Sequence, residues 1–337
     1  MVPAVAEVRA MRFHRRQFLQ LAAGAAVLPA FARTAGAQSY PTRPVRIIVP
    51  FAAGGQTDAV ARLVAQKLSD RLGKQFYVED APGGGGMIGA GRVMQAGADG
   101  YTLLSMDGTT YVVNPILFSK APYDPYKDFV PVALPATTTQ VLTVHPSMPV
   151  QTVKELVALI KANPGKYTYA SAGVGSPSHL TSELFRTSLG LDLVHVPFNG
   201  AGPAVTSTMG GHTPIAFSSP AGCVAQVRQG NLRALAVASA KRLSALPAVP
   251  TMAEAGFPQV ECDARIGFFA PTGTPKDIVD RLNREIGAII ALPDVKERFA
   301  ALGFEPLPNT PDESAALVKQ EGAKWAKVIA DAHIKVE

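Results

Sequence analysis

The chain reads VRIIVPFAAGGQTD from Val45 to Asp58, and this stretch says more about the fold than any other. A short β-rich run, Val45–Val49, leads into a glycine loop and then into the start of a helical pattern. The first N–H groups of a helix have no partner within the helix, so a strand–loop–helix unit of this kind can hold an anion. The stretch therefore predicts one half of an anion-binding site.

The helix after this loop is expected to be capped by Thr57 or Asp58, because both residue types accept hydrogen bonds from backbone N–H groups at helix starts. Asp58 stands one helical turn before Arg62, a spacing that favours an ion pair. Apolar residues recur along one side of the same helix, and Gly73 ends it.

A second unit of the same kind follows the strand predicted at residues 167–171. Its loop reads SAGVGSPSH from Ser171 to His179, with Ser176 as the expected N-cap and Pro177 in the first turn. Each loop alone also fits an ordinary strand-to-helix turn, whereas the two together favour binding. Neither loop contains Lys or Arg, so an anion held here would depend on N–H groups, hydroxyls and water.

Residues 1–37 are interpreted as an export signal that is cleaved near Ala37. Arg15-Arg16 lies in a positive segment, Phe18–Phe31 is apolar but too short to span a bilayer, and Ala35-Gly36-Ala37 offers a small-residue cleavage site. The run RRQFL fits a twin-arginine signal; an ordinary secretory signal and a start at Met11 stay open. The mature protein is thus expected in the periplasm.

Removal of this segment lowers the formal net charge from +6 to about +2, and no run of Lys and Arg remains. This distribution argues against a nucleic-acid partner. Strand-like and helix-like segments alternate along the rest of the chain, which predicts an α/β protein. The chain is expected to leave one domain near residues 135–141 and to return near residues 262–268. The predicted lobes are residues 38–138 plus 265–337, and residues 139–264.

Signatures of catalysis, metal binding and cofactor binding are weak, and none of these sites is predicted. The run GGGMIG at Gly84–Gly89 fits the G-x-G-x-x-G fingerprint but does not directly follow a strand, so it is interpreted as a pliable loop at the rim of a cleft. His179 and Glu183 lie one turn apart, and two ligands do not make a zinc site. Cys223 and Cys262 are either a disulfide or two free thiols.

The mature chain resembles the Bug/TctC group of extracytoplasmic solute receptors, which serve tripartite tricarboxylate transporters. The similarity extends in order over essentially all of it, and the succession of motifs is more specific than any one of them. The segments that carry it are Tyr40–Phe51, Gly54–Asp58, Pro82–Gly89, Asp99–Leu104, Tyr169–Ser176, Val196–Ala204, Leu232–Val237 and Val249–Pro258.

The resemblance implies a two-lobed periplasmic-binding-protein fold of the second type, with two crossovers between the lobes. It also implies that a small organic carboxylate is bound in the cleft and delivered to membrane permease subunits by a receptor expected to be a monomer. The candidate ligand-binding residues are Phe51, Ala53, Gly54, Gly55, Thr57, Asp58, Thr109, Ser171, Gly175, Ser176, His179, Asn199, Ser218 and Ser219.

Asn199 departs from the family pattern, because many relatives carry a basic residue there. An uncharged residue weakens the case for a highly charged ligand and leaves a monocarboxylate or an aromatic acid open. Two alternatives to a transport receptor also stay open: a carboxylate sensor that feeds a membrane kinase, and an exported enzyme that acts on a carboxylic acid. The sequence does not separate these alternatives or identify the carboxylate.

Overall fold

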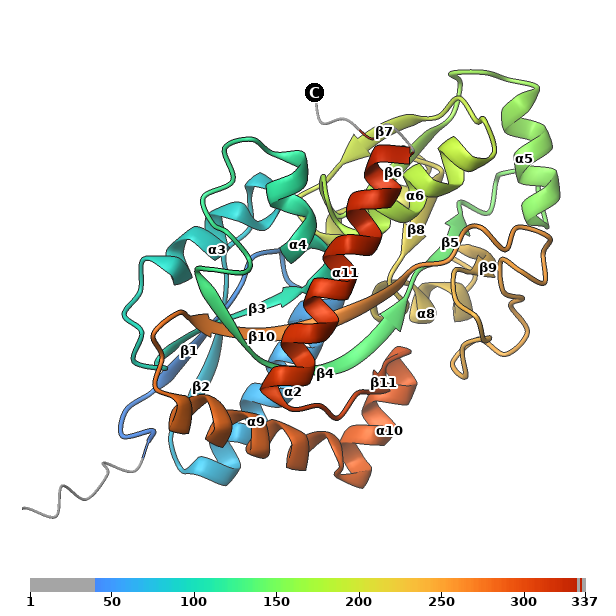
Figure 1. Cartoon of the computed structure of the whole chain (residues 1–337). Helices are drawn as coiled ribbons and strands as arrows, with labels where there is room; N and C mark the ends of the chain where they lie inside the picture. Colours follow the sequence, from blue (N-terminus) through green and yellow to red (C-terminus); the bar gives the residue numbers. More distant parts are fainter. Residues whose placement is uncertain (1–39, 332–333, 335–337) are drawn as a thin grey trace, which may run out of the picture. The chain divides into compact units, whose positions relative to one another are not determined.

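The structure is a computed structural model that describes residues 40–331 and residue 334. The interpretation of residues 1–37 as an export signal lies outside these described residues. The fold and the site lie within the described residues from Arg43 onward, which belong to one compact unit. Figure 1 shows this unit as two sheets with helices packed around them.

The first sheet has six strands in the order β11-β4-β10-β3-β1-β2. Strand β1 pairs in parallel with β2 and β3, whereas β10 runs antiparallel to β3 and β4. Four of the five residues of β1 are fully buried, as expected for a strand covered on both faces. The strands are β1 Val45–Val49, β2 Phe76–Asp80, β3 Thr102–Asp107, β4 Phe129–Thr139, β10 Asp263–Pro271 and β11 Glu305–Pro306.

Helices from both ends of the described chain cover this sheet. In Figure 1 the last helix, α11, crosses the sheet in front of β4, and α9 lies along its lower edge. Trp325 of α11 is 1% exposed, and Tyr111 of α4 stacks on Phe269 with ring centroids 4.1 Å apart. The helices are α2 Gln56–Leu72, η1 Gly84–Gly86, α3 Met87–Met94, α4 Gly108–Leu117, α9 Lys276–Ile290, α10 Pro293–Leu302 and α11 Pro311–Asp331.

The second sheet has five strands in the order β7-β6-β8-β5-β9. Strand β6 runs parallel to β7 and β8, and β5 runs antiparallel to β8 and β9. Its core is separate from that of the first sheet and includes Tyr169, Phe185 and Phe217. The elements are β5 Val141–Val144, α5 Val153–Lys161, β6 Thr168–Ser171, α6 Pro177–Ser188, β7 Val194–Pro197, α7 Ala201–Met209, β8 Ile215–Ser218, α8 Pro220–Arg228 and β9 Arg233–Val237.

Two segments join the sheets and are hydrogen-bonded to each other. Gln140 alone separates β4 from β5, and residues 238–262 lead from β9 back to β10. The backbone N–H of Ala238 donates to the carbonyl of Gln140 at 2.8 Å, and that of Cys262 donates to the carbonyl of Ala238 at 2.8 Å. The α/β class and the two-lobed fold with two crossovers are confirmed. The exact lobe limits proposed from the sequence, 138/139 and 264/265, stay a prediction.

The capping of α11, the run Gly84–Gly89 and the two cysteines are each defined by the structure. Thr310 and Glu313 form a capping box at α11, in which each backbone N–H donates to the other residue's side chain. The interpretation of Gly84–Gly89 as a loop was wrong in part, because Gly84–Gly86 forms a 3-10 turn and α3 begins at Met87. Cys223 and Cys262 are both buried free thiols, which settles that alternative in this structure.

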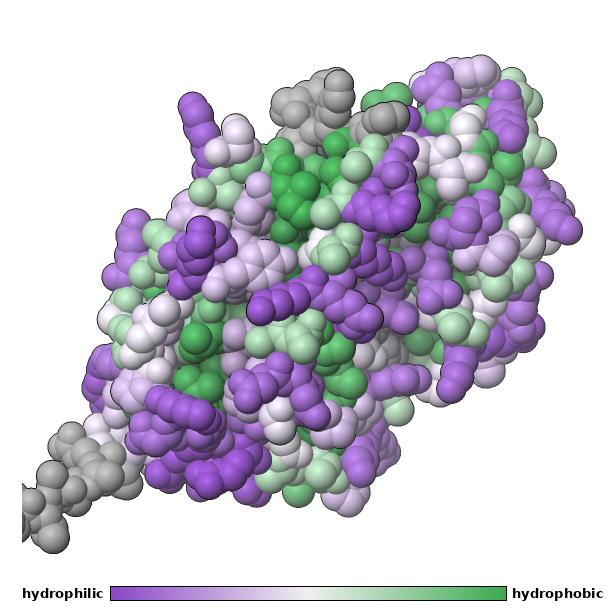
Figure 2. All heavy atoms as spheres, viewed as in Figure 1, coloured by the Kyte–Doolittle hydropathy of each residue, from purple (hydrophilic) through white to green (hydrophobic). Residues whose placement is uncertain are grey.

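The exposed surface is mainly hydrophilic on the face that Figure 2 shows, notably over α9. Helix α9 buries Val279, Leu282, Ile286 and Ile289 at helical spacing and turns its charged residues outward. Within residues 40–331 and 334, no helix is both long and apolar enough to cross a membrane.

Candidate ligand-binding site

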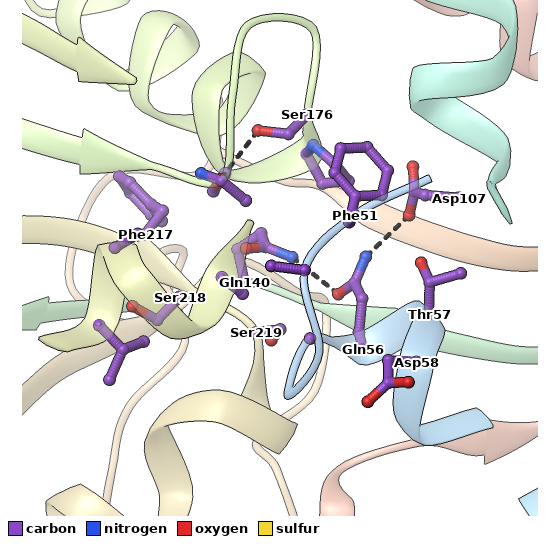
Figure 3. Close-up of a pocket in the computed structure, with 18 residues that line it drawn as sticks. Phe51, Gln56, Thr57, Asp58, Asp107, Gln140, Ser176, Phe217, Ser218 and Ser219 are labelled. Atoms are coloured by element: carbon purple, nitrogen blue, oxygen red, sulfur yellow. Dashed lines mark hydrogen bonds between the residues drawn. The ribbon is translucent and has the colours of Figure 1, made fainter. Parts of the chain in front are cut away.

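One cavity, with a volume of about 50 Å³, lies between elements of the two sheets. Figure 3 shows its lining, to which both sheets and the crossover residue Gln140 contribute. The lining residues are Phe51, Ala52, Gly55, Gln56, Thr57, Asp58, Asp107, Gln140, Ala172, Ser176, Pro177, Ser178, Ala201, Ala204, Val205, Phe217, Ser218 and Ser219.

The first glycine loop enters the cavity between β1 and α2. Helix α2 begins at Gln56 with Gly55 as its N-cap, so the prediction that Thr57 or Asp58 caps it was wrong. Asp58 instead accepts a hydrogen bond from the backbone N–H of Gly54 at 2.9 Å. The predicted ion pair is present, with Arg62 Nε 2.6 Å from Asp58 Oδ1. The loop therefore leaves the first N–H groups of α2 at the cavity.

The second glycine loop reaches the cavity from the other sheet, between β6 and α6. Ser176 is the N-cap of α6, as predicted: its Oγ accepts from the backbone N–H of His179 at 3.3 Å and donates to the carbonyl of Gly173 at 2.6 Å. Pro177 occupies the first turn, where its missing N–H costs nothing. Ser178 Oγ accepts from the backbone N–H of Ala172 at 2.9 Å and fixes the loop.

Two further helices, α7 and α8, also begin at the cavity. Gly200 and Ser219 are their N-caps, and Ala201, Ser218 and Ser219 all line the cavity. The Oγ of Ser219 is buried and has no hydrogen-bond partner among the described residues, so it is available to a ligand. With α2 and α6, four helix N-termini thus converge on one small space.

The lining is unusual in its charges. Its eighteen residues include two carboxyl side chains, Asp58 and Asp107, and no Lys, Arg or His. Positive potential at the cavity therefore comes from helix N-termini, each equivalent to about half an elementary charge. Converging N–H groups and hydroxyls suit an anion with several acceptor oxygens, such as a carboxylate.

Half of the residues predicted from the sequence lie on this cavity. They come from three separate loops and from both sheets. The seven are Phe51, Gly55, Thr57, Asp58, Ser176, Ser218 and Ser219.

The other predicted residues lie close to the cavity but do not line it. Gly54 and Ala53 form the outer part of the first loop, and the carbonyl of Ala53 lies 3.1 Å from where a Cβ on Gly202 would stand. Asn199 touches the same loop through its backbone, since its carbonyl accepts from the N–H of Ala52 at 3.2 Å. Thr109 is fully buried and donates to Glu321 on α11.

Ser171, Gly175 and His179 belong to the second loop but do not line the cavity. Ser171 Oγ lies 2.6 Å from His195 Nε2, and His179 Nδ1 accepts from the backbone N–H of Gly175 at 3.2 Å. The two imidazoles stack with centroids 4.3 Å apart. Burial lowers the pKa of His179 to about 3 and that of His195 to about 4, so both rings are neutral at pH 7.

Four polar residues of the cavity, Gln56, Asp107, Gln140 and Ser178, were not predicted as site residues. Gln56 Nε2 donates to Asp107 Oδ2 at 2.8 Å, and Gln140 Nε2 donates to Gln56 Oε1 at 3.3 Å (Figure 3). Gln56 lies within the stretch Val45–Asp58, and Asp107 lies at roughly the distance of a ribose-binding carboxylate after the rejected G-x-G-x-x-G match at Gly84–Gly89. No sequence motif marks Gln140 as a site residue, because it reaches the cavity only through its position in the crossover between the two sheets.

The histidine and acidic residues do not assemble into a metal centre in the part of the chain that the structure describes. No group of three His, Cys, Asp or Glu residues there is arranged to hold a metal ion. His179 and Glu183 instead belong to a local network in which Glu183 bonds to Tyr169 and to Arg186.

Comparison with known proteins agrees with this geometry. The family model described as tripartite tricarboxylate transporter family receptor matches residues 60–334. Protein BugT of Bordetella pertussis (strain Tohama I) is 37% identical over 319 residues, which are 93% of this chain and 98% of BugT.

Two solved structures are similar over nearly the same span. The periplasmic binding protein BugD gives a TM-score of 0.85 at 36% identity, covering 88% of this chain and 100% of BugD. An R. palustris protein with adipate gives a TM-score of 0.85 at 34% identity, covering 88% of this chain and 99% of that protein. The resemblance found in the sequence is confirmed: the chain belongs to the Bug/TctC family of tripartite tricarboxylate transporter receptors.

Proposed function

We propose that this receptor captures a small organic carboxylate between its two lobes in the periplasm and delivers it to the membrane subunits of a tripartite tricarboxylate transporter. The observation that carries the proposal is the convergence of four helix N-termini on a cavity without cationic side chains. A related protein bound to adipate supports the same class of ligand. Cleavage of the export signal near Ala37 and a monomeric state are part of this proposal.

Capture requires the lobes to separate. A volume of about 50 Å³ holds only a few water molecules. The lobes are in contact beside the cavity, for example through the hydrogen bond from the Ala52 N–H to the Asn199 carbonyl. The crossovers at Gln140 and at residues 238–262 are the natural hinge. A ligand that touches both lobes stabilises the closed form by its differential affinity for it.

The test is a binding screen on protein that begins after Ala37. Thermal shift followed by calorimetry should detect one or more members of a panel of mono-, di- and tricarboxylates, including adipate and aromatic acids. Amines and neutral sugars of similar size serve as controls. Binding of the controls without any carboxylate would show that the ligand class is wrong.

Three further measurements separate the alternatives. Mass analysis of the bound compound after long incubation should recover it unchanged, whereas a product would favour an enzyme. Uptake of the compound by vesicles that contain the permease subunits should depend on added receptor, whereas dependence of a membrane kinase on it would favour a sensor. Light scattering should give the mass of one chain.

A further inference from the structure

Asp107 occupies an unusual position in the cavity. It ends β3, caps α4 and is only 1% exposed. Its Oδ1 accepts from the backbone N–H of Thr110 at 3.1 Å, and its Oδ2 accepts from Gln56 Nε2 at 2.8 Å. In Figure 3 its carboxyl group points toward Gln56 at the edge of the cavity. An anionic ligand in this cavity therefore meets the Asp107 carboxyl group.

Asp107 differs from the other acids near the cavity in having no cationic partner. Asp58 is paired with Arg62 at 2.6 Å, and Glu321 is paired with Arg265 at 3.2 Å. Among the ion pairs of the described residues, none includes Asp107. A buried carboxylate without a cation favours its neutral form.

A second buried acid lies directly behind Asp107. Glu321 of α11 accepts a hydrogen bond from Thr109, and its Oε2 lies 3.1 Å from where a Cβ on Gly108 would stand. Burial, and then the charge of Glu321, raise the pKa of Asp107 to about 8, against the opposing effect of hydrogen bonds from Thr110, Thr109 and Gln56. Burial raises the pKa of Glu321 as well, but the hydrogen bond from Thr109 and the charge of Arg265 oppose that rise. Asp107 has no cationic partner, so we assign the proton to Asp107.

The other ionisable groups around Asp107 do not change the conclusion that Asp107 carries the proton. Lys324 of α11 acts on Glu321 and on the thiol of Cys262, which itself is buried and has a raised pKa. Arg265 of strand β10 forms its ion pair with Glu321 and not with Asp107. Helix α2 contributes Asp58, which would oppose a second negative charge. The residues of α6 and α7 that line the cavity are uncharged, as are the N-caps of α6 and α8.

We propose that Asp107 is a specificity-determining residue of this receptor, which holds a proton while a carboxylate is bound, so that the anion and the proton are captured together. The inference rests on the proposed capture of a carboxylate. The ligand enters as the anion, and Asp107 takes one proton from solvent wherever it is ionised beforehand. No covalent bond is made or broken with the ligand. The neutral acid can donate a hydrogen bond to a polar group where its carboxylate would repel the anion.

The sign of the pH dependence follows. Well below pH 8, Asp107 is already protonated in the free receptor. Ligand binding then takes up almost no proton, and the affinity is nearly independent of pH. At pH 8 binding takes up about half a proton, and well above it close to one. The affinity falls there by up to about tenfold per pH unit. A ligand that placed an ammonium group against Asp107 would reverse the sign and release a proton.

The experiment is calorimetry of wild-type receptor with adipate at pH 6, 8 and 9.5, in buffers of different ionisation enthalpy. If adipate does not bind, the other carboxylates of the panel are used in turn. Failure of the whole panel overturns the proposed function and this inference with it. Binding with no proton uptake at pH 8 and 9.5, or with proton release, overturns this inference alone.

Variants identify the group that takes up the proton. Asp107→Asn should abolish proton uptake and flatten the pH profile, because the amide stays neutral. Asp58→Asn, the same change in the other carboxyl of the cavity, should leave proton uptake in place. Loss of proton uptake in Asp58→Asn but not in Asp107→Asn would show that Asp58 takes up the proton, and would overturn the inference.

A third variant tests the inference independently if Asp107→Asn does not fold. Glu321→Gln removes the neighbouring negative charge, so the midpoint of the affinity profile should move to lower pH while uptake persists. Infrared difference spectra of the wild type at pH 9.5 should also gain the C=O band of a protonated carboxyl when the ligand is added. An unchanged midpoint together with no new band contradicts the proposal.

Discussion

Gln140 Nε2 lies 3.3 Å from Gln56 Oε1, so that the crossover between the two sheets is hydrogen-bonded to the first turn of α2. Gln56 in turn donates to Asp107, and all three side chains line the cavity. The proposed hinge and the proposed ligand site therefore share Gln140. A change at the cavity can therefore act directly on the crossover and alter the balance between open and closed lobes.

The hydrogen bond between Gln140 and Gln56 should be measurable as a coupling energy. A double-mutant cycle of Gln140→Ala and Gln56→Ala in urea unfolding is expected to give about 1 kcal/mol. Gln140→Ala combined with Gln229→Ala, at an exposed site, is the control and should be additive. A coupling no larger than that of the control would mean that the side chains do not interact in solution.

A negative charge at the cavity wall should selectively prevent anion binding. Ser218 is 5% exposed and lines the cavity. Ser218→Asp and Ser218→Asn add side chains of nearly equal size, and only the first adds a charge. We expect calorimetry to show carboxylate affinity at least about tenfold lower in the Asp variant than in the Asn variant, because like charges repel strongly at low dielectric. Equal losses in both variants would point to steric effects alone.

Closure of the lobes should be sensitive to a methyl group at Gly200. Its φ is +137°, and a Cβ there would lie 3.0 Å from both the Cβ and the backbone N of Ala52 on the other side of the cavity. Gly200→Ala should weaken carboxylate binding about tenfold, because overpacking costs about 1–3 kcal/mol.

Gly230→Ala is the matched control for this change. Gly230 also has a positive φ, +77°, but no atom lies within 4 Å of the added Cβ. Both variants should lose about 1 kcal/mol of stability through backbone strain. Only Gly200→Ala should lose affinity, and an equal loss in both would argue against contact-dependent closure.

Stability should decrease in mild acid because His179 is buried as the neutral ring. Burial lowers its pKa to about 3 in the folded chain from its ordinary value of 6.5, so the unfolded chain binds more protons between these limits. The contribution of the neutral His179 ring to the free energy of unfolding is complete above pH 6.5. It is lost as the pH falls toward 3, at up to about 1.4 kcal/mol per pH unit. Urea unfolding of His179→Gln at pH 7, 5.5 and 4.5 should show a shallower decrease. A parallel decrease in both proteins would exclude this histidine as the cause.

The stability of the ligand-free protein should depend on Asp107 in the opposite pH range. The pKa of Asp107 is about 8 in the folded chain and has its ordinary value of 3.8 in the unfolded chain, so the destabilising effect of its burial is absent below pH 4 and is fully developed above pH 8. Asp107→Asn should therefore raise the melting temperature by a few degrees at pH 8.5, roughly the effect of 1 kcal/mol. Thermal scans at pH 4 should show a smaller gain or none, and a gain independent of pH would contradict the assignment.

Sequence patterns predicted the parts of the site that depend on neighbours along the chain. The N-cap at Ser176 and the ion pair between Asp58 and Arg62 each involve residues within one helical turn. The N-cap of α2 was misplaced, because Gly55 takes an extended conformation at the cap while Asp58 accepts the Gly54 N–H. Glycine gives no side-chain signal at such a position, so the start of the helix could not be located from residue preferences alone.

The sequence by itself determined the α/β alternation, the two glycine loops followed by helices, and the absence of cationic residues from both loops. These are properties of short segments, set by periodicity, turn chemistry and composition. Only the tertiary structure brought Asp107, Gln56 and Gln140 together and placed Glu321 behind Asp107. Those residues come from β3, α2, the crossover and α11, and their pairing depends on how the sheets pack. Because electrostatic effects on a carboxyl group depend on distance and burial, its proton could be assigned only after folding had fixed both.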